Sequence, residues 1–347
     1  MLNRSNLAPL VRRALPFCAA LTAADPVFAD HLGPSSIGSG GGMSVFDAGT
    51  LDAGHWAVGL RLTYTRPEGR SDAELEALAA QHIHAHNTDD NLVASLGAAY
   101  GITHHLTVSA ELPYLRRDRL REGTHAHVGG VALNGVEELG SVVGLGDATI
   151  LAKYRLTEGQ GAGFALIGGV KLPTGSTHRH SLAGERLETE HQPGTGSWNP
   201  IVGAAASLPM RKVQLSASAL YQFSTTGAQE TRLGDRLQGG IALSHRFGPT
   251  EHEHHHEGGS SEHHHDDSRP AWDGFVELAG EWEGRQTIAG EVEEASGGEW
   301  VYAAPGVRFT ASGWSASASV AMPLWQDIRP SHPNNRYRLM LSVGRAF

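Results

Sequence analysis

This chain contains almost no cysteine. Its 347 residues include one cysteine, Cys18, which lies near the N-terminus in a stretch that we expect to be removed. A mature chain without thiols has no disulfide, no thiolate metal site and no cysteine nucleophile. The net formal charge is −10 at pH 7. Because basic residues are not in excess, we expect no nucleic acid partner.

Long apolar runs and catalytic motifs are also missing. Beyond the N-terminus no stretch of about 18 apolar residues occurs, so no membrane-spanning helix is predicted there. The sequence has no Gly-x-Ser-x-Gly, P-loop or dinucleotide-binding motif, and no His-Glu-x-x-His in a helical setting. We therefore expect no enzyme. One enzymatic alternative stays open, a lipid hydrolase with serine and histidine on the outer wall of a barrel.

The N-terminus has the features of a secretory signal peptide. A positive stretch with Arg4, Arg12 and Arg13 precedes a short apolar core and a small-residue cleavage site near Ala29. A disordered tail is the alternative. The predicted divisions are a signal peptide over 1–29, an N-terminal periplasmic segment over 30–54 and a folded domain over 55–347.

From His55 onward, apolar residues recur at every second position. In the first such segment Trp56, Val58 and Leu60 share one face, while small or polar residues occupy the other, which is typical of a half-buried strand. About twelve segments of about ten residues each follow this pattern. They are 55–65, 91–100, 106–114, 146–156, 163–173, 199–208, 213–223, 235–247, 272–283, 300–310, 314–323 and 336–347.

Strand length and loop asymmetry together indicate a membrane barrel. A tilted strand of about ten residues crosses a bilayer. The connections 66–90, 115–145 and 174–198 are long and predicted to be extracellular, whereas 101–105, 157–162 and 209–212 are short, as in outer-membrane barrels. Aromatic residues at strand ends would form two interfacial girdles. They are Trp56, Tyr64, Tyr100, Tyr114, Tyr154, Trp272, Trp282, Trp300 and Trp325.

The sequence therefore predicts an all-β fold, an antiparallel transmembrane β-barrel of about twelve strands in the outer membrane of a Gram-negative bacterium. Its apolar face would contact outer-membrane lipid, since a spanning sheet must close to satisfy its edges. A soluble periplasmic metal-binding β-sandwich is the alternative, with the same apolar face buried inside.

The alternation also assigns charged residues to the lumen. Charges of both signs there imply either a hydrated pore or an internal salt-bridge network that closes it, and the pattern leaves both open. The predicted inward residues are Arg61, Glu111, Asp147, Lys153, Arg155, Lys171, Glu277, Glu281 and Arg338.

Three glycine-rich stretches carry a family resemblance: Gly144–Asp147, Gly168–Gly175 and Gly194–Gly196. With them the chain resembles the bacterial outer-membrane family named for the meta-pathway of phenol degradation, over about 50–250. The resemblance implies an outer-membrane channel for small organic compounds; its motifs are turns and strand ends, so they support fold better than substrate. The final Phe347 resembles the C-terminal aromatic recognised by the barrel-insertion machinery, which is therefore an expected partner.

The chain has 21 histidines, and the densest group lies in the connection 248–271. Neutral imidazoles and carboxylates bind zinc, copper or nickel, so this tract is predicted to bind divalent metal. A merely solvated linker is the alternative. In the predicted topology the tract faces the periplasm. The candidate ligands are His252, His254, His255, His256, His263, His264, His265, Asp266 and Asp267.

Smaller histidine groups occur in the predicted extracellular loops. Alternate histidines on an extended segment share a face and can chelate, although surface histidines are more often unliganded. They are His82, His84 and His86 in the first loop, His125 and His127 in the second, and His178 and His180 in the third.

Two functions from different classes follow. The first is a barrel channel for small solutes or metal ions, with a histidine-rich loop that binds divalent metal and no cofactor required for folding. The second is a non-conducting outer-membrane protein with a metal-binding or structural role.

Overall fold

The structure, a computed structural model, describes residues 42–128, 131–158, 162–247 and 270–347. The strands are β1 (Trp56–Pro67), β2 (His86–Asn87), β3 (Asp90–Thr103), β4 (Leu106–Val128), β5 (Val131–Leu145), β6 (Thr149–Arg155), β7 (Gly163–Lys171), β8 (Asn199–Met210), β9 (Val213–Gln222), β10 (Thr231–Arg232), β11 (Arg236–Phe247), β12 (Ala271–Glu283), β13 (Thr287–Ile288), β14 (Glu291–Val292), β15 (Gly298–Ala311), β16 (Trp314–Ile328) and β17 (Asn335–Ala346). The helices are α2 (Asp72–Ala79) and the short 3₁₀ turns η2 (Thr189–His191) and η3 (Ala228–Glu230).

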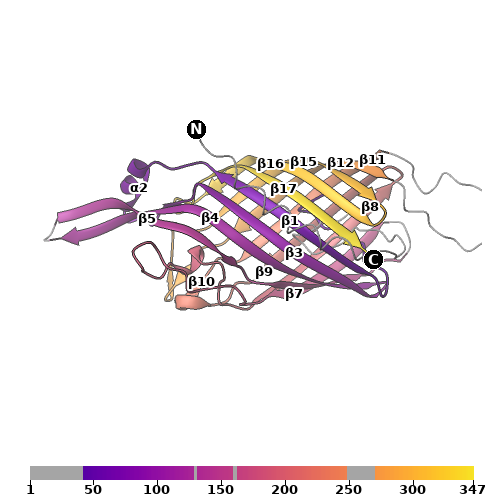
Figure 1. The fold of residues 1–347 in the computed structure, drawn as a ribbon, viewed down its shortest axis with the longest axis horizontal. Coiled ribbons are helices and arrows are strands. Elements are labelled where there is room, and N and C mark those ends of the chain that lie inside the picture. Colours follow the sequence, from indigo (N-terminus) through magenta and orange to yellow (C-terminus); the bar gives the residue numbers. More distant parts are fainter. Residues whose placement is uncertain (1–41, 129–130, 159–161, 248–269) are drawn as a thin grey trace, which may run out of the picture.

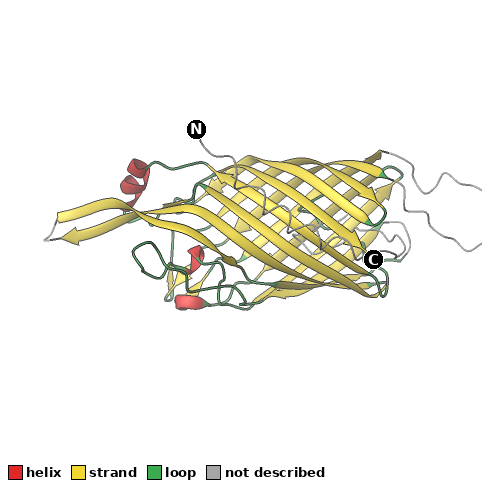
Figure 2. Cartoon of the chain, in the orientation of Figure 1, coloured by secondary structure: helices red, strands yellow, loops and turns green. Residues whose placement is uncertain are grey.

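Within these described ranges, twelve strands form one closed antiparallel ring (Figures 1 and 2). Its order is β4, β3, β1, β17, β16, β15, β12, β11, β9, β8, β7, β6, and β6 pairs with β4 to close it. Each ring strand overlaps one of the predicted segments. The predicted barrel is confirmed, and the sandwich alternative is wrong because a single sheet closes on itself.

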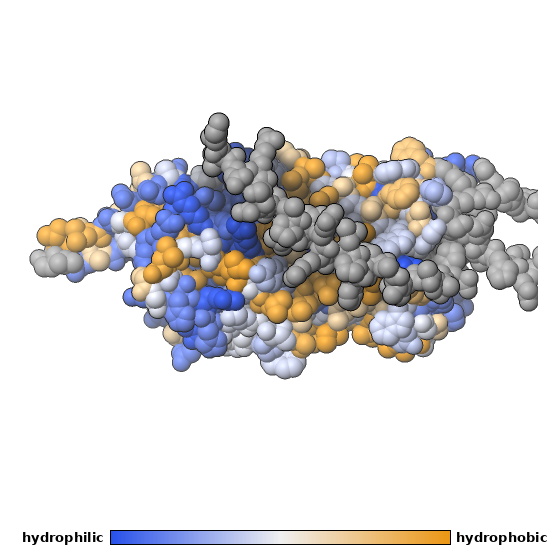
Figure 3. Space-filling model, in the orientation of Figure 1, coloured by the Kyte–Doolittle hydropathy of each residue, from blue (hydrophilic) through white to orange (hydrophobic). Residues whose placement is uncertain are grey.

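The apolar face of the strands points outward. On β12, Val276 is 56% exposed, whereas its neighbour Glu277 is fully buried inside the ring. Figure 3 shows apolar residues along the visible barrel wall and hydrophilic residues gathered at the end that carries the long connections. This pattern suits lipid outside and polar groups inside. Trp300 departs from the predicted girdle, since its side chain packs against the inner cluster of Tyr302 and Met340.

The predicted loop 115–145 is wrong in part. β4 continues to Val128 and pairs with β5, so that a long hairpin projects beyond the barrel (Figure 1). α2 packs on this hairpin through Leu75, and its first turn is closed by a capping box between Ser71 and Glu74. In the described ranges no helix is both long and apolar enough to span a membrane.

The start of β1 and the end of β17 lie at the same end of the barrel, because Ala57 pairs with Ala346. By the rule for outer-membrane barrels this end is periplasmic, and the opposite end, with the β4–β5 hairpin, is extracellular. The alternating strand directions place Phe247 and Ala271 at the periplasmic end as well. The histidine tract between them lies outside the described residues.

Candidate channel lumen and extracellular mouth

Residues 42–51 lie inside the barrel and cross its lumen. The carbonyl oxygen of Gly42 accepts a hydrogen bond of 3.0 Å from Nη2 of Arg308 on β15. The carboxylate of Asp47 lies 3.5 Å from Nζ of Lys153 on β6. Strands β15 and β6 face each other across the ring, so the segment spans the interior between them.

Polar and apolar contacts hold this segment. Nη1 of Arg61 donates to the carbonyl of Met43 (2.8 Å), and the carboxylate of Glu277 accepts from the backbone N–H of Met43 and of Ser44. Phe46 packs into a buried cluster of the wall formed by Leu151, Ile167, Ile201 and Ala205. The buried carboxylate and guanidinium thus satisfy backbone groups that would otherwise be orphaned in the lumen.

This placement differs from the prediction of a periplasmic segment over 30–54. The described part, from Gly42, runs inside the barrel, and it reaches the periplasmic end where the backbone N–H of Leu51 donates to Thr107 (2.8 Å). The physical reason is burial: Met43, Phe46 and Leu51 are apolar and find partners on the inner wall. Residues 30–41, and the predicted signal peptide, lie outside the described ranges.

The nine charged residues predicted to face the lumen all lie on the inward side of the wall. Arg61, Glu277 and Lys153 contact the inner segment, as described above. Arg338 forms a two-bond pair with Glu281, at 2.6 and 3.2 Å. The others on this side are Glu111, Asp147, Arg155 and Lys171. In the described ranges opposite charges are therefore paired inside the ring, as in Arg338–Glu281 and Lys153–Asp47.

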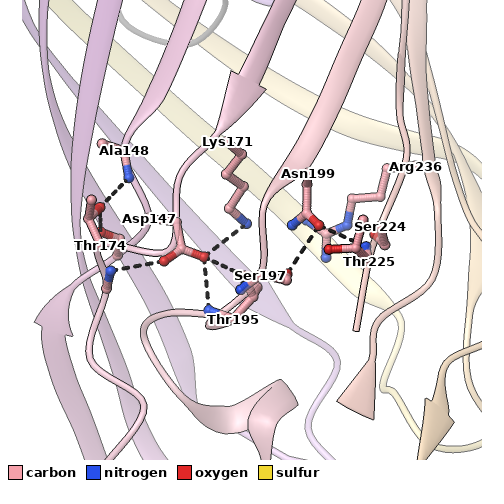
Figure 4. Close-up of polar contacts among 12 residues, drawn as sticks. Asp147, Ala148, Lys171, Thr174, Thr195, Ser197, Asn199, Ser224, Thr225 and Arg236 are labelled. Atoms are coloured by element: carbon pink, nitrogen blue, oxygen red, sulfur yellow. Dashed lines mark hydrogen bonds and ion pairs between the residues drawn. The ribbon is translucent and has the colours of Figure 1, made fainter. Parts of the chain in front are cut away.

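Asp147 organises the extracellular rim of the lumen (Figure 4). Its side chain is fully buried. One carboxylate oxygen accepts from the backbone N–H of Gly175 (2.9 Å), and the other accepts from the backbone N–H (2.8 Å) and the hydroxyl (2.6 Å) of Thr195. Nζ of Lys171 lies 3.9 Å from it. The carboxylate thereby joins the β7–β8 connection to the start of β6.

The glycines of these motifs allow that close approach. A Cβ atom on Gly175 would lie 2.6 Å from Cα of Gly194, which no real side chain tolerates without movement of the backbone. The three glycine-rich stretches noted in the sequence therefore meet at one place in the fold. Their shared role is to build the rim around Asp147.

A second polar group lies over the mouth, where His86, Glu190 and His191 meet. Nδ1 of His86 lies 3.3 Å, and Nε2 of His191 3.5 Å, from the same Oε1 of Glu190. The rings of His86 and His332 are also in edge contact, with centroids 4.6 Å apart. Nε2 of Gln286 donates to the other oxygen of Glu190 (2.8 Å).

Burial keeps these imidazoles neutral. Loss of solvation lowers the pKa of His86 to about 3 and that of His332 to about 4, and it lowers the pKa of His191 well below its usual value. By contrast, the interaction with Glu122 raises the pKa of the more exposed His84 to about 9. At neutral pH the buried histidines thus offer ring-nitrogen lone pairs, whereas His84 is a cation.

The other histidines that the sequence suggested as metal ligands do not join this buried group in the described residues. The rings of His82 and His127 each contact that of His125, at 4.4 and 4.7 Å between centroids. His178 and His180 are exposed in the β7–β8 connection. The ligands proposed in the tract, from His252 to Asp267, lie outside the described residues.

His191 and His332 were missed by the sequence analysis. Neither stands near another histidine in the chain, so no local spacing marks them. Residues 42–51 were missed as part of the lumen, although Met43, Val45 and Phe46 form a short apolar stretch just before the first strand.

The closed ring, its apolar outer face and its long connections at one end define an outer-membrane β-barrel protein. A family profile described as "Putative MetA-pathway of phenol degradation" matches residues 62–275, more than half of the chain, and the chain belongs to that family. No curated protein matches the chain.

Several solved structures are similar in fold. The COG4313 outer membrane channel from Pseudomonas putida F1 is 17% identical, with a TM-score of 0.50, over 87% of this chain and 98% of that one. The NanC porin is 6% identical, with a TM-score of 0.39, over 83% and 98% of the two chains. The CymD monoaromatic hydrocarbon channel is 9% identical, with a TM-score of 0.37, over 85% and 88%. At 17% identity the likeness to the COG4313 channel concerns the barrel fold.

Proposed function

We propose that the protein is a passive outer-membrane channel for small organic solutes, narrowed at its middle by residues 42–51. The observation that carries this proposal is the lumen itself, which is walled by charged side chains and, within the part of the chain that the structure describes, crossed by residues 42–51 rather than filled by a folded domain. A polar interior within an apolar exterior is what a solute path through lipid requires. Membership of a family described by phenol degradation favours small organic molecules as cargo.

Purified protein in planar lipid bilayers is expected to give discrete current steps, because a lumen that residues 42–51 narrow without closing would link the two aqueous compartments. Liposomes that contain it should swell in solutes of phenol size and much less in solutes of oligosaccharide size. Heat-unfolded protein is the control. A folded barrel that gives neither steps nor solute flux would contradict the channel proposal.

The second candidate is a non-conducting outer-membrane protein, and one observation favours it: residues 42–51, held by Arg61 and Glu277, occupy the middle of the lumen. The bilayer experiment separates the two candidates, because a silent barrel that still binds zinc supports this one. Both are passive, and in neither do we assign a reaction to the protein.

Metal binding by the histidine tract, which is predicted to face the periplasm, stays a prediction. Replacing its seven histidines, between His252 and His265, by glutamine keeps the length while it removes the imidazole ligands. We expect the zinc stoichiometry of the full-length protein to fall by about one ion or more, with heat-modifiable mobility unchanged. Equal zinc stoichiometry in the wild type and in this variant would show that the tract does not bind zinc.

A further inference from the structure

The group over the extracellular mouth is assembled from connections on several sides of the ring. His86 belongs to the β1–β3 connection, Glu190 and His191 to the β7–β8 connection, Gln286 to the β12–β15 connection and His332 to the β16–β17 connection. Strands β7 and β8 stand across the ring from β17 and β16. The group therefore lies where loops from opposite sides meet above the lumen.

From this geometry we propose that His86, Glu190 and His191 form a binding site for a divalent transition-metal ion of the zinc type. The three side chains offer ligand atoms that all lie within 4.8 Å of one another. Two ligands bonded to one tetrahedral zinc stand about 3.4 Å apart. The two histidine–glutamate separations, 3.3 and 3.5 Å, already have that length.

An independent observation comes from His191. Its side chain is 3% exposed, and its Nε2 has no hydrogen-bond partner within the described residues. A buried polar nitrogen without a partner is unfavourable, so a ligand directed at it would relieve that cost. This nitrogen is the one directed at the Glu190 carboxylate.

The surrounding contacts hold the ligands in place. Nη1 of Arg117 donates to the carbonyl of Glu190 (2.7 Å), and the backbone N–H of His86 donates to the carbonyl of Ser331 (3.0 Å). Nη2 of Arg70 donates to the carbonyl of His332 (2.6 Å). Outer contacts of this kind orient ligands in metal sites. A bound ion would join the β1–β3 and β7–β8 connections over the mouth, and the proposal does not depend on whether the barrel conducts.

The test uses full-length protein that has been stripped with a chelator and titrated with zinc. Wild type is expected to bind one more tight zinc ion than His191→Gln or His86→Gln, and the affinity of that site should fall at least about 100-fold, since changes outside the ligand shell alone cause 10–100-fold losses. The exposed His180→Gln, in the same β7–β8 connection, is the matched control and should bind like wild type. The periplasmic tract is intact in all these proteins and contributes equally.

Crystals of wild-type protein soaked in zinc supply a second readout that does not depend on how the variants fold. An anomalous peak at the zinc edge is expected among His86, Glu190 and His191. The near-isosteric Glu190→Gln variant, checked by heat-modifiable mobility, should lose that peak. Zinc peaks elsewhere with none at this position, or equal stoichiometry in wild type and His191→Gln, would overturn the proposal.

Discussion

Deleting residues 42–50 from the lumen is expected to raise the single-channel conductance at least about twofold, because a twelve-stranded barrel is narrow and any segment across it takes up much of its section. The deletion removes the main chain that runs from Arg308 on β15 to Lys153 on β6. The charges that held it, Arg61 and Glu277, would then face water, which solvates them. We therefore expect the barrel to remain folded.

The measurement is conductance in planar bilayers, together with heat-modifiable mobility as the check on folding. Deletion of the nine residues 32–40 is a length-matched control that leaves the contacts of Met43 and Asp47 in place, and it should conduct like wild type. A substitution gives the same test without shortening the chain: Glu277→Ala removes the acceptor for the Met43 and Ser44 backbone groups and should raise conductance in part. Unchanged conductance in the deletion would show that the segment does not limit flow.

The strands could be predicted because their signal is local. Side chains alternate with a period of two along any strand, so the apolar residues Trp56, Val58 and Leu60 indicate within a few positions which face points outward. The hairpin of β4 and β5 could not be predicted in the same way. It projects past the bilayer, where neither face needs to be apolar, and it is held by pairing and by α2 packed through Leu75.

The sites that depend on ring closure gave no local signal. His86, His191 and His332 are far apart in the chain, and only the pairing of the first and last strands and the reach of the β7–β8 connection bring them together. A search by spacing finds His86 together with His82 and His84, but it does not find His191 or His332. The course of the segment through Met43 is hidden for the same reason, since nothing in its residues records that the inner wall offers Tyr302 and Ala304 to pack against.

Asp147→Ala is expected to destabilise the barrel by about 3 kcal/mol or more, the range found when one partner of a buried ionic network is removed. The substitution leaves the backbone N–H groups of Gly175 and Thr195, and the Thr195 hydroxyl, without their acceptor. It also leaves the half-buried Lys171 without the carboxylate beside it. Each such loss in a buried position is unfavourable, because water cannot replace the missing acceptor.

Urea unfolding in lipid vesicles measures this loss of stability, and two further variants serve as comparisons. Asp147→Asn keeps one carbonyl oxygen of the same shape, so it can retain the bond to Gly175 or those to Thr195 and should lose clearly less stability than the alanine variant. Asp327→Ala removes an exposed carboxylate at the extracellular end of β16 and should stay within about 0.5 kcal/mol of wild type. If Asp147→Ala unfolds like Asp327→Ala, the rim does not depend on this carboxylate. The meeting of the three glycine-rich stretches would then need another cause, such as the close backbone contact of Gly175 with Gly194 alone.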